Sequence, residues 1–503
     1  MASLSSVKQW DHECDLLICG FGLAGASAAI EAVDNFPDSE VLIIEKAPEE
    51  HAGGNSRVAG QSLMIPGEKQ SLLEYQRHMS ESNPIPEDVL EFWAEEMCNL
   101  EPWIRARAEE VGAKFIYGTG FSDRGTVLEY PEYGASDAVA HTATILPIPS
   151  GVWIAFEKNI RKRNINIEFE YQLVDLIQDP DTLEVLGAVV RNGDRTVYIR
   201  ARQGVVMATG GYENNLDMQR NYFGLTEAYA MGTPYNTGDG VKILQKAGAD
   251  LWHMRSKGQS GGLWPAIKTS HQDTAYLRNI LMQTFSWVDL ASDGKRFYNE
   301  TADLRRTHYK ELKHGHYLDV PLAQLLPVTM LFDEVTRQHN SLVFRPFTWN
   351  TVVEGYEWSE DNQAEVDNGI IIKADTIEEL AEKLAIDTQA VIDTIRAYNA
   401  GCESGEDAFG REGTTLQPIA QAPFYALNIV PGIVCTSGGA KRNTQSQVLG
   451  HDGQPIPRLY EAGELGSMFS MFSNLYQNGC YLTEAMITGR AAARSAMTLE
   501  SWQ

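Results

Sequence analysis

The sequence predicts an α/β fold in which a main domain is interrupted by an inserted α+β domain. Over residues 15–46 a strand, a glycine-rich turn, a small-residue helix and a second strand follow one another. Between about 270 and 432 the chain becomes richer in aromatic and basic residues, and it then returns to short apolar strands and small-residue helices. Its 503 residues are enough for two domains with cores of their own.

The N-terminal segment has the pattern of a Rossmann-like, dinucleotide-binding βαβ unit. Gly20 permits a tight turn after the first strand, Gly22 lets the backbone approach a pyrophosphate, and Gly25 lets the helix pack closely on the sheet. The helix N-terminus adds free N–H groups and a partial positive charge, which suit phosphate oxygens. The segment therefore predicts a dinucleotide site rather than a glycine-rich turn without a ligand.

Glu45 ends the second strand, twenty residues after Gly25. A carboxylate there accepts hydrogen bonds from the ribose hydroxyls of the adenosine half and disfavours a 2′-phosphate. The dinucleotide is therefore expected to be FAD or NAD rather than NADP. In the loop that follows, Asn55 and Ser56 are expected to donate to a phosphate or an isoalloxazine ring, the alternative being a flexible loop that binds nothing.

The next segments are typical of a scaffold. Residues 69–112 are predicted to be helical, with a break at Pro84 and Pro86. A β-meander and then a buried strand ending in glycine are predicted at 165–177, 186–190, 196–199 and 204–211. Asp239 stands at the start of a helix over 241–249, as a helix cap or as a ligand.

In the inserted block, a capping box predicts a helix over Thr376–Leu384, and a second helix is expected from Thr388 to Gly401.

Composition excludes several classes of function. A net charge of -27 and a pI of about 4.8 disfavour binding to nucleic acid or to a membrane through a basic surface. The six cysteines form no C-x-x-C pair, so an iron–sulfur cluster, a zinc cluster or a covalent haem is not expected. No apolar run approaches the ~20 residues that span a bilayer, and the N-terminus has no apolar leader. We therefore expect a soluble, cytoplasmic protein.

Further motifs are spread along the chain: Gly20-Phe-Gly22-Leu-Ala-Gly25, Glu45-Lys46, Gly53-Gly-Asn-Ser56, Ala208-Thr-Gly-Gly211, Thr237-Gly-Asp-Gly240, Gly294-Lys-Arg-Phe-Tyr-Asn-Glu300, Tyr460-Glu-Ala-Gly-Glu464 and Gly489-Arg490. With this set the chain resembles the flavoproteins of the fumarate reductase and 3-ketosteroid dehydrogenase superfamily. The resemblance implies a discontinuous FAD-binding domain, residues 1–272 and 434–503, and a catalytic or capping domain, residues 273–433. It implies FAD contacts at Gly20, Gly22, Leu23, Ala24, Gly25, Glu45, Lys46, Gly54, Asn55, Ser56, Gly60, Val174, Ala208, Thr209, Gly210, Asp239, Glu464, Tyr481 and Leu482.

The mode of FAD binding also follows from the resemblance. A histidine-linked flavin in this superfamily needs a histidine in the loop after the ribose acid. That loop has Asn55 and Ser56, and His51 comes too early. The FAD is therefore expected to be non-covalent. Only one dinucleotide fingerprint is present, so a second bound NAD is not expected.

The fumarate branch of the superfamily matches poorly. Its His-Thr-x-Gly-Gly segment reads Cys435-Thr-Ser-Gly-Gly439, without the histidine. Its arginine near the C-terminal glycines is replaced by the segment Leu475–Gly479. Arg305 or Arg306 matches the arginine that follows Asn-Glu only with a spacing one residue longer. Fumarate reduction is therefore disfavoured.

The segment from Tyr476 to Arg490 resembles the ketosteroid dehydrogenases, most closely the branch acting on the C4–C5 bond. In that family a tyrosine hydroxyl, here Tyr476, and a nearby backbone N–H, here near Asn478 and Gly479, polarise the substrate ketone. A second tyrosine is usually the base, but the family's tyrosines after Asn-Glu are missing. The remaining candidates for the base are Tyr298, Tyr309, Tyr130 and Tyr117.

Arg305 and Arg306 have three interpretations: they lower the pKa of a tyrosine base, they hold a substrate carboxylate, or they are surface charge.

The resemblance therefore implies an FAD-dependent dehydrogenase that introduces an α,β double bond into a cyclic ketone, by removal of an α proton and transfer of the β hydride to flavin N5. The substrate is a 3-ketosteroid or a small alicyclic ketone such as 4-oxocyclohexanecarboxylate, with the smaller, acidic kind slightly favoured. The alternative is a reductase of an activated C=C bond, like an enoate or fumarate reductase. A third hypothesis is a redox sensor that binds FAD without turnover. Because no cysteine cluster is expected, the electrons need an external acceptor.

Overall fold

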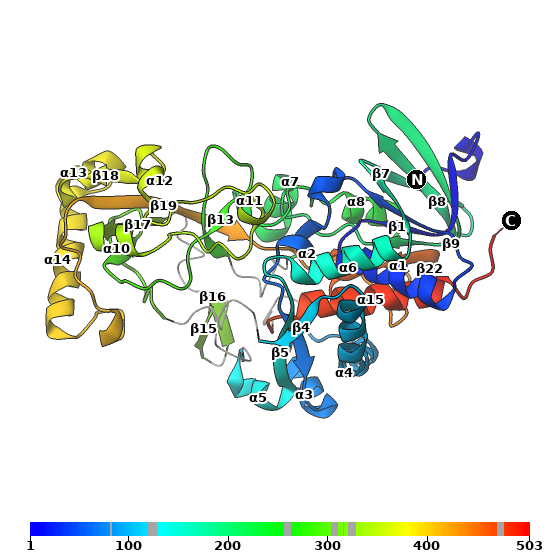
Figure 1. Ribbon diagram of the computed structural model, residues 1–503, viewed down its shortest axis with the longest axis horizontal. Helices are drawn as coiled ribbons and strands as arrows, with labels where there is room; N and C mark the ends of the chain where they lie inside the picture. The colour runs from blue at the N-terminus through cyan, green and yellow to red at the C-terminus, as the bar shows by residue number, and fades with distance from the viewer. Residues whose placement is uncertain are drawn as a thin grey trace. The chain divides into compact units, whose positions relative to one another are not determined.

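The computed structural model describes residues 1–80, 83–118, 128–255, 263–302, 310–314, 316–319, 328–469 and 477–502 (Figure 1). The chain forms two compact units. The first unit comprises Met1–Thr226, Gly232–Gly261 and Cys435–Gln503, and the second comprises Glu227–Met231 and Gly262–Val434.

The boundary of the second unit differs from the predicted residue 273. Strand β12 (Trp264–Ile267) and strand β10 (Tyr229–Ala230) both pair with β19 (Phe424–Ile433), so backbone hydrogen bonds draw these earlier segments into the second unit.

An eight-stranded sheet forms the centre of the first unit. Its strands are β1 (His12–Cys19), β2 (Val41–Glu45), β6 (Asn166–Phe169), β7 (Gln172–Gln178), β8 (Val185–Asn192), β9 (Arg195–Met207), β21 (Gln447–Leu449) and β22 (Pro455–Glu461). Along the order β22-β9-β1-β2-β6 neighbouring strands are parallel. The carboxyl ends of these strands therefore lie at one edge of the sheet, where α/β proteins bind their ligands.

Strand β9 joins two parts of that sheet. The segments 196–199 and 204–207, expected as separate strands, are one continuous strand. Its first half pairs with β8 across a turn at Gly193 (φ +56°), and its second half is parallel to β1 and β22. Because one continuous strand pairs with β8 in its first half and with β1 and β22 in its second half, the chain makes no turn between these two halves. The predicted hairpin at Asn192-Gly193 is present, but β6 pairs with β2 rather than with the meander.

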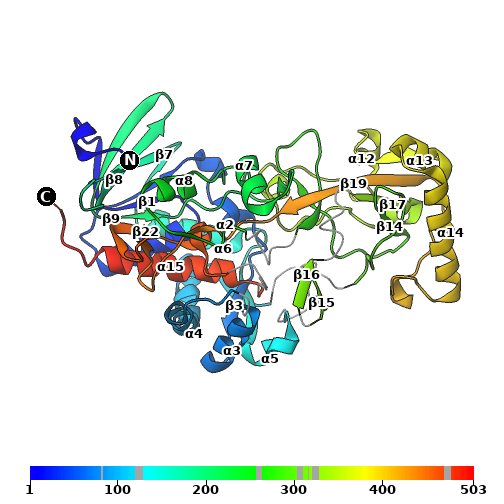
Figure 2. The ribbon, with the colours of Figure 1, turned by 180° about the vertical axis from the view of Figure 1, so that it is seen from behind.

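Helices α1 (Leu23–Asn35) and α15 (Cys480–Ala496) pack against each other, and α15 runs along β9 and β22 (Figures 1 and 2). Their close approach depends on Gly489, because a Cβ there would lie 2.2 Å from the carbonyl oxygen of Ala24. Arg490 pairs with Glu31 of α1 at 2.8 Å. The Gly489-Arg490 motif thus joins the last helix to the first.

The first unit contains further helices and short strands. The helices are α2 (Gly54–Val58), α3 (Lys69–Met79), α4 (Glu87–Glu110), α5 (Ala135–Ala138), α6 (Gly151–Lys162), α7 (Leu216–Met218) and α8 (Asp239–Lys246). A three-stranded sheet has the order β3 (Leu63–Pro66), β5 (Val139–Leu146), β4 (Lys114–Tyr117), and β11 (Leu251–Trp252) pairs with β20 (Gly439–Ala440). The break predicted between α3 and α4 is confirmed. None of the helices described is both long enough and apolar enough to cross a bilayer.

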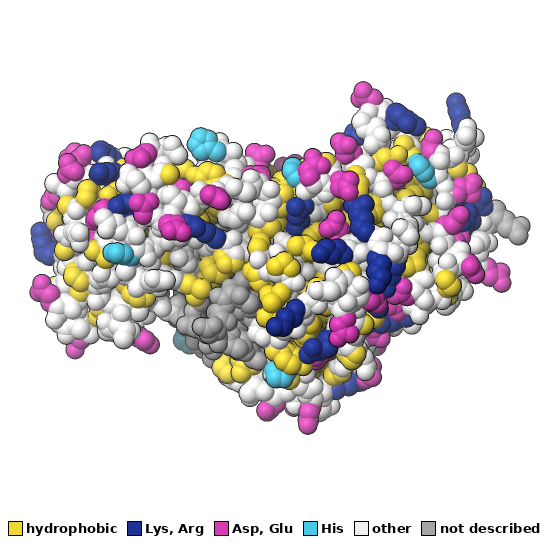
Figure 3. Space-filling view, viewed as in Figure 1, with side chains coloured by type: hydrophobic (Ala, Val, Ile, Leu, Met, Phe, Trp, Pro, Cys, Tyr) yellow, Lys and Arg dark blue, Asp and Glu magenta, His cyan; other side chains and the backbone are white. Residues whose placement is uncertain are grey.

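Basic side chains gather over the α6 region on the face of the first unit seen in Figure 3. Several arginines there have acidic partners: Arg161 pairs with Glu49, and Arg163 pairs with Asp34 and Glu110. These local pairs offset the basic charge at the surface.

The second unit is built on a seven-stranded sheet around β19, which Figure 2 shows beside β17 and β14. Its remaining strands are β13 (Tyr276–Leu277), β14 (Trp287–Leu290), β17 (Val328–Asp333) and β18 (Ile372–Ala374). Side chains of β17 alternate between two cores, with Met330 and Phe332 in one and Leu331 in the other. The unit also has a β15 (Lys310–Lys313) and β16 (His316–Asp319) hairpin and the helices α10 (Glu334–His339), α11 (Trp349–Val352), α12 (Gln363–Asp367), α13 (Ile377–Leu384) and α14 (Thr388–Ser404).

The two helices predicted in the insert are present. The hydroxyl of Thr376 accepts from the backbone N–H of Glu379 at 3.1 Å, as a capping box requires. Helix α14 does not end at Gly401 as predicted. It continues to Ser404, and Gly405 (φ +74°) supplies the left-handed cap.

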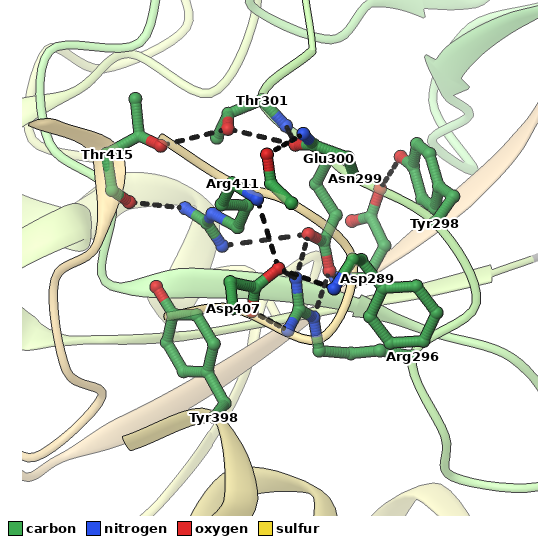
Figure 4. A network of polar contacts seen from close by, with 12 residues as sticks. Asp289, Arg296, Tyr298, Asn299, Glu300, Thr301, Tyr398, Asp407, Arg411 and Thr415 are labelled. Atoms are coloured by element: carbon green, nitrogen blue, oxygen red, sulfur yellow. Dashed lines mark hydrogen bonds and ion pairs between the residues drawn. The ribbon is translucent and has the colours of Figure 1, made fainter. Parts of the chain in front are cut away.

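The Gly294–Glu300 motif forms a buried ion network in the second unit (Figure 4). The guanidinium of Arg296 donates to both carboxylate oxygens of Glu300, at 2.7 and 2.6 Å, and to Asp407 at 2.6 Å. Arg411 lies 3.7 Å from Glu300 and donates to the carbonyl of Trp287. The network ties β14 to the loop that contains Asp407.

We expect Arg296→Met to destabilise the protein strongly, because it leaves Glu300 and Asp407 buried without their shared cation. Breaking such a buried pair costs about 3–5 kcal/mol. The free energy of unfolding, from urea denaturation, measures the loss. Lys295→Met is the matched control: that side chain is 68% exposed, so its replacement should change the free energy by less than about 0.5 kcal/mol. Equal effects of the two variants would show that the network does not stabilise the fold.

Candidate functional site

The glycine turn at the carboxyl end of β1 has two kinds of glycine. Gly20 has φ +113°, and a Cβ there would lie 2.3 Å from the carbonyl oxygen of Ala208; a Cβ on Gly25 would lie 2.1 Å from that of Gly20. The fold itself therefore requires both. A Cβ on Gly22 would come no closer than 3.5 Å, to the hydroxyl of Ser56. The protein leaves room beside Gly22, as a ligand approaching the backbone needs.

The segment after β2 packs against this turn. Gly22 caps α1, and Leu23 and Ala24 form its first turn. The backbone N–H of Leu23 donates to Ser56 Oγ at 3.0 Å. Gly54 begins α2, and Gly60 follows that helix and is half-buried. The loop after the predicted ribose acid thus contacts the start of the predicted phosphate-binding helix.

Glu45 lies beside the same turn. Its carboxylate accepts from the backbone N–H groups of Phe21 and Ala47, at 2.8 and 2.9 Å. Burial raises the pKa of Glu45. This acid is therefore held at the edge of the sheet next to the glycine turn.

Lys46 forms an ion pair with Asp239 at 2.8 Å and donates to Thr237 Oγ1 at 2.7 Å. Burial alone would raise the pKa of Asp239, but the hydrogen bond and charge of Lys46 outweigh it and lower that pKa. Gly238 is the cap of α8, and Asp239 is its first residue. Asp239 is therefore engaged by Lys46 rather than acting as a helix cap.

Asn55 connects three segments that are far apart in the sequence. Its Nδ2 donates to Glu213 Oε1 at 2.7 Å and to Glu464 at 3.2 Å, and its Oδ1 accepts from the backbone N–H of Thr233 at 3.0 Å. Glu213 also accepts from Asn236 Nδ2 at 2.9 Å. Two carboxyl groups thus meet at one amide beside the glycine turn.

The segment after β9 completes this edge. The Ala208 backbone N–H donates to the carbonyl of Cys19 at 2.8 Å. Thr209 Oγ1 is buried without a hydrogen-bond partner among the described residues. Gly210 (φ +70°) leaves room for the side chain of Asn236. Val174 lies at the bulge between β7 and β8, with its side chain 38% exposed.

A second polar group surrounds the start of α15. Gly479 (φ +92°) caps that helix, and a Cβ on it would lie 2.4 Å from the backbone nitrogen of Met64. The Asn478 backbone N–H donates to Glu129 Oε2 at 2.8 Å, and its side chain donates to Ser62 at 3.4 Å. The hydroxyl of Tyr75 donates to Gln477 at 2.9 Å. Apart from Glu129, these are neutral hydrogen-bonding groups.

In the first turn of α15, the hydroxyl of Tyr481 hydrogen-bonds to that of Ser437, and Leu482 is half-buried.

The described tyrosine candidates lie in three different surroundings. Tyr130 is fully buried with a left-handed backbone (φ +52°), next to Glu129 in the chain. Tyr298 is in the core of the second unit, where its hydroxyl donates to Asp289 at 2.5 Å and burial raises its pKa. Tyr117 is 49% exposed and donates to Glu101. Of these three, Tyr130 is the one that neighbours a member of the polar group at α15, Glu129, in the chain. Arg305, Arg306, Tyr309 and Tyr476 lie outside the described residues.

Two carboxyl groups of these clusters were missed in the sequence. Glu213 is a carboxyl just after the glycine pair that follows β9, a position at the ligand-binding edge that could have indicated a role. Glu129 stands in an irregular segment with no periodic pattern, so no local signal pointed to it.

The comparisons with known proteins agree with this geometry. A family model described as the FAD binding domain matches residues 15–480, so the chain belongs to this family. The chain is 27% identical to a digoxin reductase of Eggerthella lenta, over 98% of this chain and 89% of that protein. It is 26% identical to an NADH:acrylate oxidoreductase of Vibrio harveyi, over 98% of this chain and 51% of that protein.

The fold is shared with a solved 3-ketosteroid Δ1-dehydrogenase of Sterolibacterium denitrificans (TM-score 0.75, 18% identity, covering 97% of this chain and 100% of that one).

The predictions of an α/β fold and of FAD are therefore confirmed. The chain is an FAD-dependent oxidoreductase of the fumarate reductase and ketosteroid dehydrogenase superfamily. The residues at the strand edge fit a dinucleotide, because Gly22 leaves room for a close backbone approach and the buried Thr209 hydroxyl is left to be satisfied.

We expect Gly22→Ala to fold but to bind FAD at least about tenfold more weakly. The added methyl group meets no protein atom within 3.5 Å, but it fills the space left beside the backbone. Gly25→Ala is the matched variant, since its methyl group would meet a backbone carbonyl at 2.1 Å and should destabilise the apo-protein. Thermal unfolding without FAD and fluorescence titration with FAD separate the two effects. Unchanged FAD affinity in Gly22→Ala would contradict a close approach at this turn.

Proposed function

We propose that the protein interconverts the saturated and α,β-unsaturated forms of a neutral cyclic ketone, such as a 3-ketosteroid or a small alicyclic ketone. In this proposal the first unit binds FAD non-covalently, and the second is the catalytic or capping domain. Non-covalent binding is supported by the loop after β2: Ser56 contacts the glycine turn, Asn55 donates to Glu213, and His51 Nδ1 lies 2.9 Å from the hydroxyl of Tyr235. An external acceptor or donor exchanges electrons with the FAD.

The polar group at the start of α15 is the observation that carries the proposal. Its hydrogen-bonding side chains Ser62, Tyr75 and Asn478 are neutral, and the one charged member described is the carboxyl of Glu129. Neutral donors suit a carbonyl oxygen, and the described members of this group include no cation that would hold a substrate carboxylate. This arrangement supports a neutral ketone rather than the acidic substrate that the sequence slightly favoured.

Each chain residue has a distinct part in the reaction. Tyr476 and the backbone at Gly479 polarise the ketone, which stabilises the enolate formed when the α proton leaves. Tyr130 is the proposed base, because it is buried and, alone of the described candidates, directly follows a member of this polar group, Glu129, in the chain. Tyr298 is a poor base, because its hydroxyl is held by Asp289 in the core of the second unit. When bound, FAD accepts or donates the hydride at the β carbon.

Dehydrogenation is the direction that the sequence predicts. A specific observation favours the second candidate, reduction of the double bond: the two relatives described above, which match 98% of this chain, are named as a reductase and as an acrylate oxidoreductase. The same residues serve both directions. The groups that polarise the ketone oxygen act in dehydrogenation and in reduction, and the residue that removes the α proton in one direction returns it in the other.

The direction can be measured with the purified flavoprotein under anaerobic conditions. We expect a saturated 3-ketosteroid or cyclohexanone to bleach the flavin band near ~450 nm if the enzyme dehydrogenates, and the matching enone to restore it in chemically reduced enzyme if it reduces. 4-Oxocyclohexanecarboxylate, fumarate and acrylate are the charged comparisons and should react more slowly. A faster reaction with the carboxylates would contradict the neutral-ketone proposal, and no reaction with any of them would favour the redox-sensor hypothesis.

Substitution of the proposed base tests its assignment. We expect Tyr130→Phe to lower the rate of flavin reduction or reoxidation by about 10²–10⁴-fold without changing FAD binding, because a general base contributes that much. Tyr117→Phe is the control, since that hydroxyl is exposed and bonded to Glu101. Stopped-flow absorbance gives the rates. Equal rates in the wild type and Tyr130→Phe would remove Tyr130 from the mechanism.

A further inference from the structure

Glu213 has a place in the first unit that the FAD-binding motifs do not assign. Its side chain is fully buried, and its Oε2 has no hydrogen-bond partner among the described residues. A Cβ built on Gly211 would lie 2.6 Å from this atom and 2.6 Å from Glu464 Oε1. The two oxygens therefore converge on the same small space next to a cofactor-binding glycine segment.

The surroundings do not balance two negative charges. The charged groups on the elements around the pair are Lys46, Arg57, Asp239, the exposed Lys242 and Lys246 of α8, and Arg442, which pairs with Glu461 and Glu484. The neutral titratable groups there are Tyr212, Tyr235, Cys435 and Tyr481. Lys46 is the cation whose charge acts on Glu213, and it is already paired with Asp239 at 2.8 Å. Arg57, on α2, donates to the backbone carbonyls of Glu50 and Ala52.

Glu213 and Glu464 also accept fewer and longer hydrogen bonds than two ionised carboxylates normally accept. Glu213 Oε1 accepts from Asn55 and Asn236, and Glu464 accepts longer bonds, from Asn55 at 3.2 Å and from the Thr436 backbone N–H at 3.3 Å. Two buried carboxyl groups that share one donor, and that have no cation of their own among the described residues, are more stable with a single proton between them than with none.

We propose that Glu213 is a cofactor-site residue and that Glu213 and Glu464 carry one shared proton when FAD binds. The proton removes one of two negative charges beside a ligand whose pyrophosphate is itself anionic. It also turns the pair from an acceptor into a hydrogen-bond donor. FAD binding is therefore coupled to protonation of this pair, and by linkage FAD favours uptake of the proton.

The pKa values agree with this geometry. Burial, its largest cause, raises the pKa of Glu213 to about 7, and burial together with the nearby charge of Glu213 raises that of Glu464 well above its usual value. Because the folded pKa is raised above that of the unfolded chain, the folded state holds the proton more tightly. The associated stability is present at low pH and is lost as the pH rises through the raised pKa values of the pair.

The test is equilibrium binding of FAD to the full chain stripped of its cofactor, from pH 6 to pH 9, without substrate. We expect the Kd to rise by up to about tenfold per pH unit above the pKa of the pair. Calorimetry at several pH values between 6 and 9, in two buffers of different ionisation enthalpy, should show proton uptake that grows toward one proton per FAD as the pH rises above the pKa of the pair in the apo-protein. Because no turnover is measured, this result is independent of the ketone reaction proposed above.

Substitutions of buried glutamates test whether the proton is held by the Glu213 and Glu464 pair. Glu213→Gln should bind FAD with little dependence on pH and without proton uptake, because the amide permanently supplies a neutral donor. Glu461→Gln is the matched control: that glutamate is fully buried in the same unit, but it lies beside Arg442 at 3.5 Å, so the pH dependence should persist. The proposal is overturned if wild-type affinity is constant from pH 6 to 9, if no proton is taken up, or if Glu213→Gln keeps the wild-type slope. Should Glu213→Gln not fold, proton uptake by the wild type decides.

Discussion

The parallel alignment of β22, β9, β1 and β2 is the constraint on which the cofactor site depends. It brings four carboxyl ends to one edge of a single sheet, although the strands end at Cys19, Glu45, Met207 and Glu461. The glycine turn, Glu45, the Thr209 segment and Glu464 all follow these strand ends. Without that alignment, the motifs would be isolated turns with no common ligand.

The sequence predicted this edge well, because each strand carries a local signal. Apolar runs end in glycine or an acid, and the turn needs glycine for steric reasons that are visible in the residue types. The pairing of strands was less predictable: β9 serves two partners, and β12 joins β19 across a long stretch of chain. Such pairing depends on long-range hydrogen bonds, which leave no periodic pattern in the sequence.

The proposed substrate side was harder to predict, since its residues come from irregular segments. Glu129 and Ser62 contact Asn478 only because α15 begins next to β3. Tyr298 was a reasonable candidate on sequence grounds, yet its hydroxyl belongs to a buried network with Asp289 and Arg278. A tyrosine next to a family motif therefore says little about catalysis until its partner is known. The motif itself, through Arg296 and Glu300, stabilises the second unit.

Family motifs in this chain thus divide by what their residues contact. Gly20, Gly25 and Gly489 are required by atoms of the protein, because a Cβ on each would meet a backbone carbonyl at 2.1–2.3 Å. At Gly22 and the Thr209 hydroxyl, by contrast, the protein leaves space or an unsatisfied polar atom. A bound ligand explains the positions where space or an unsatisfied atom is left. It is not needed to explain the three glycines that the fold itself requires. The same distinction applies to buried acids: Glu300 is neutralised by arginine within the fold, whereas Glu213 shares its amide donor with a second carboxyl group.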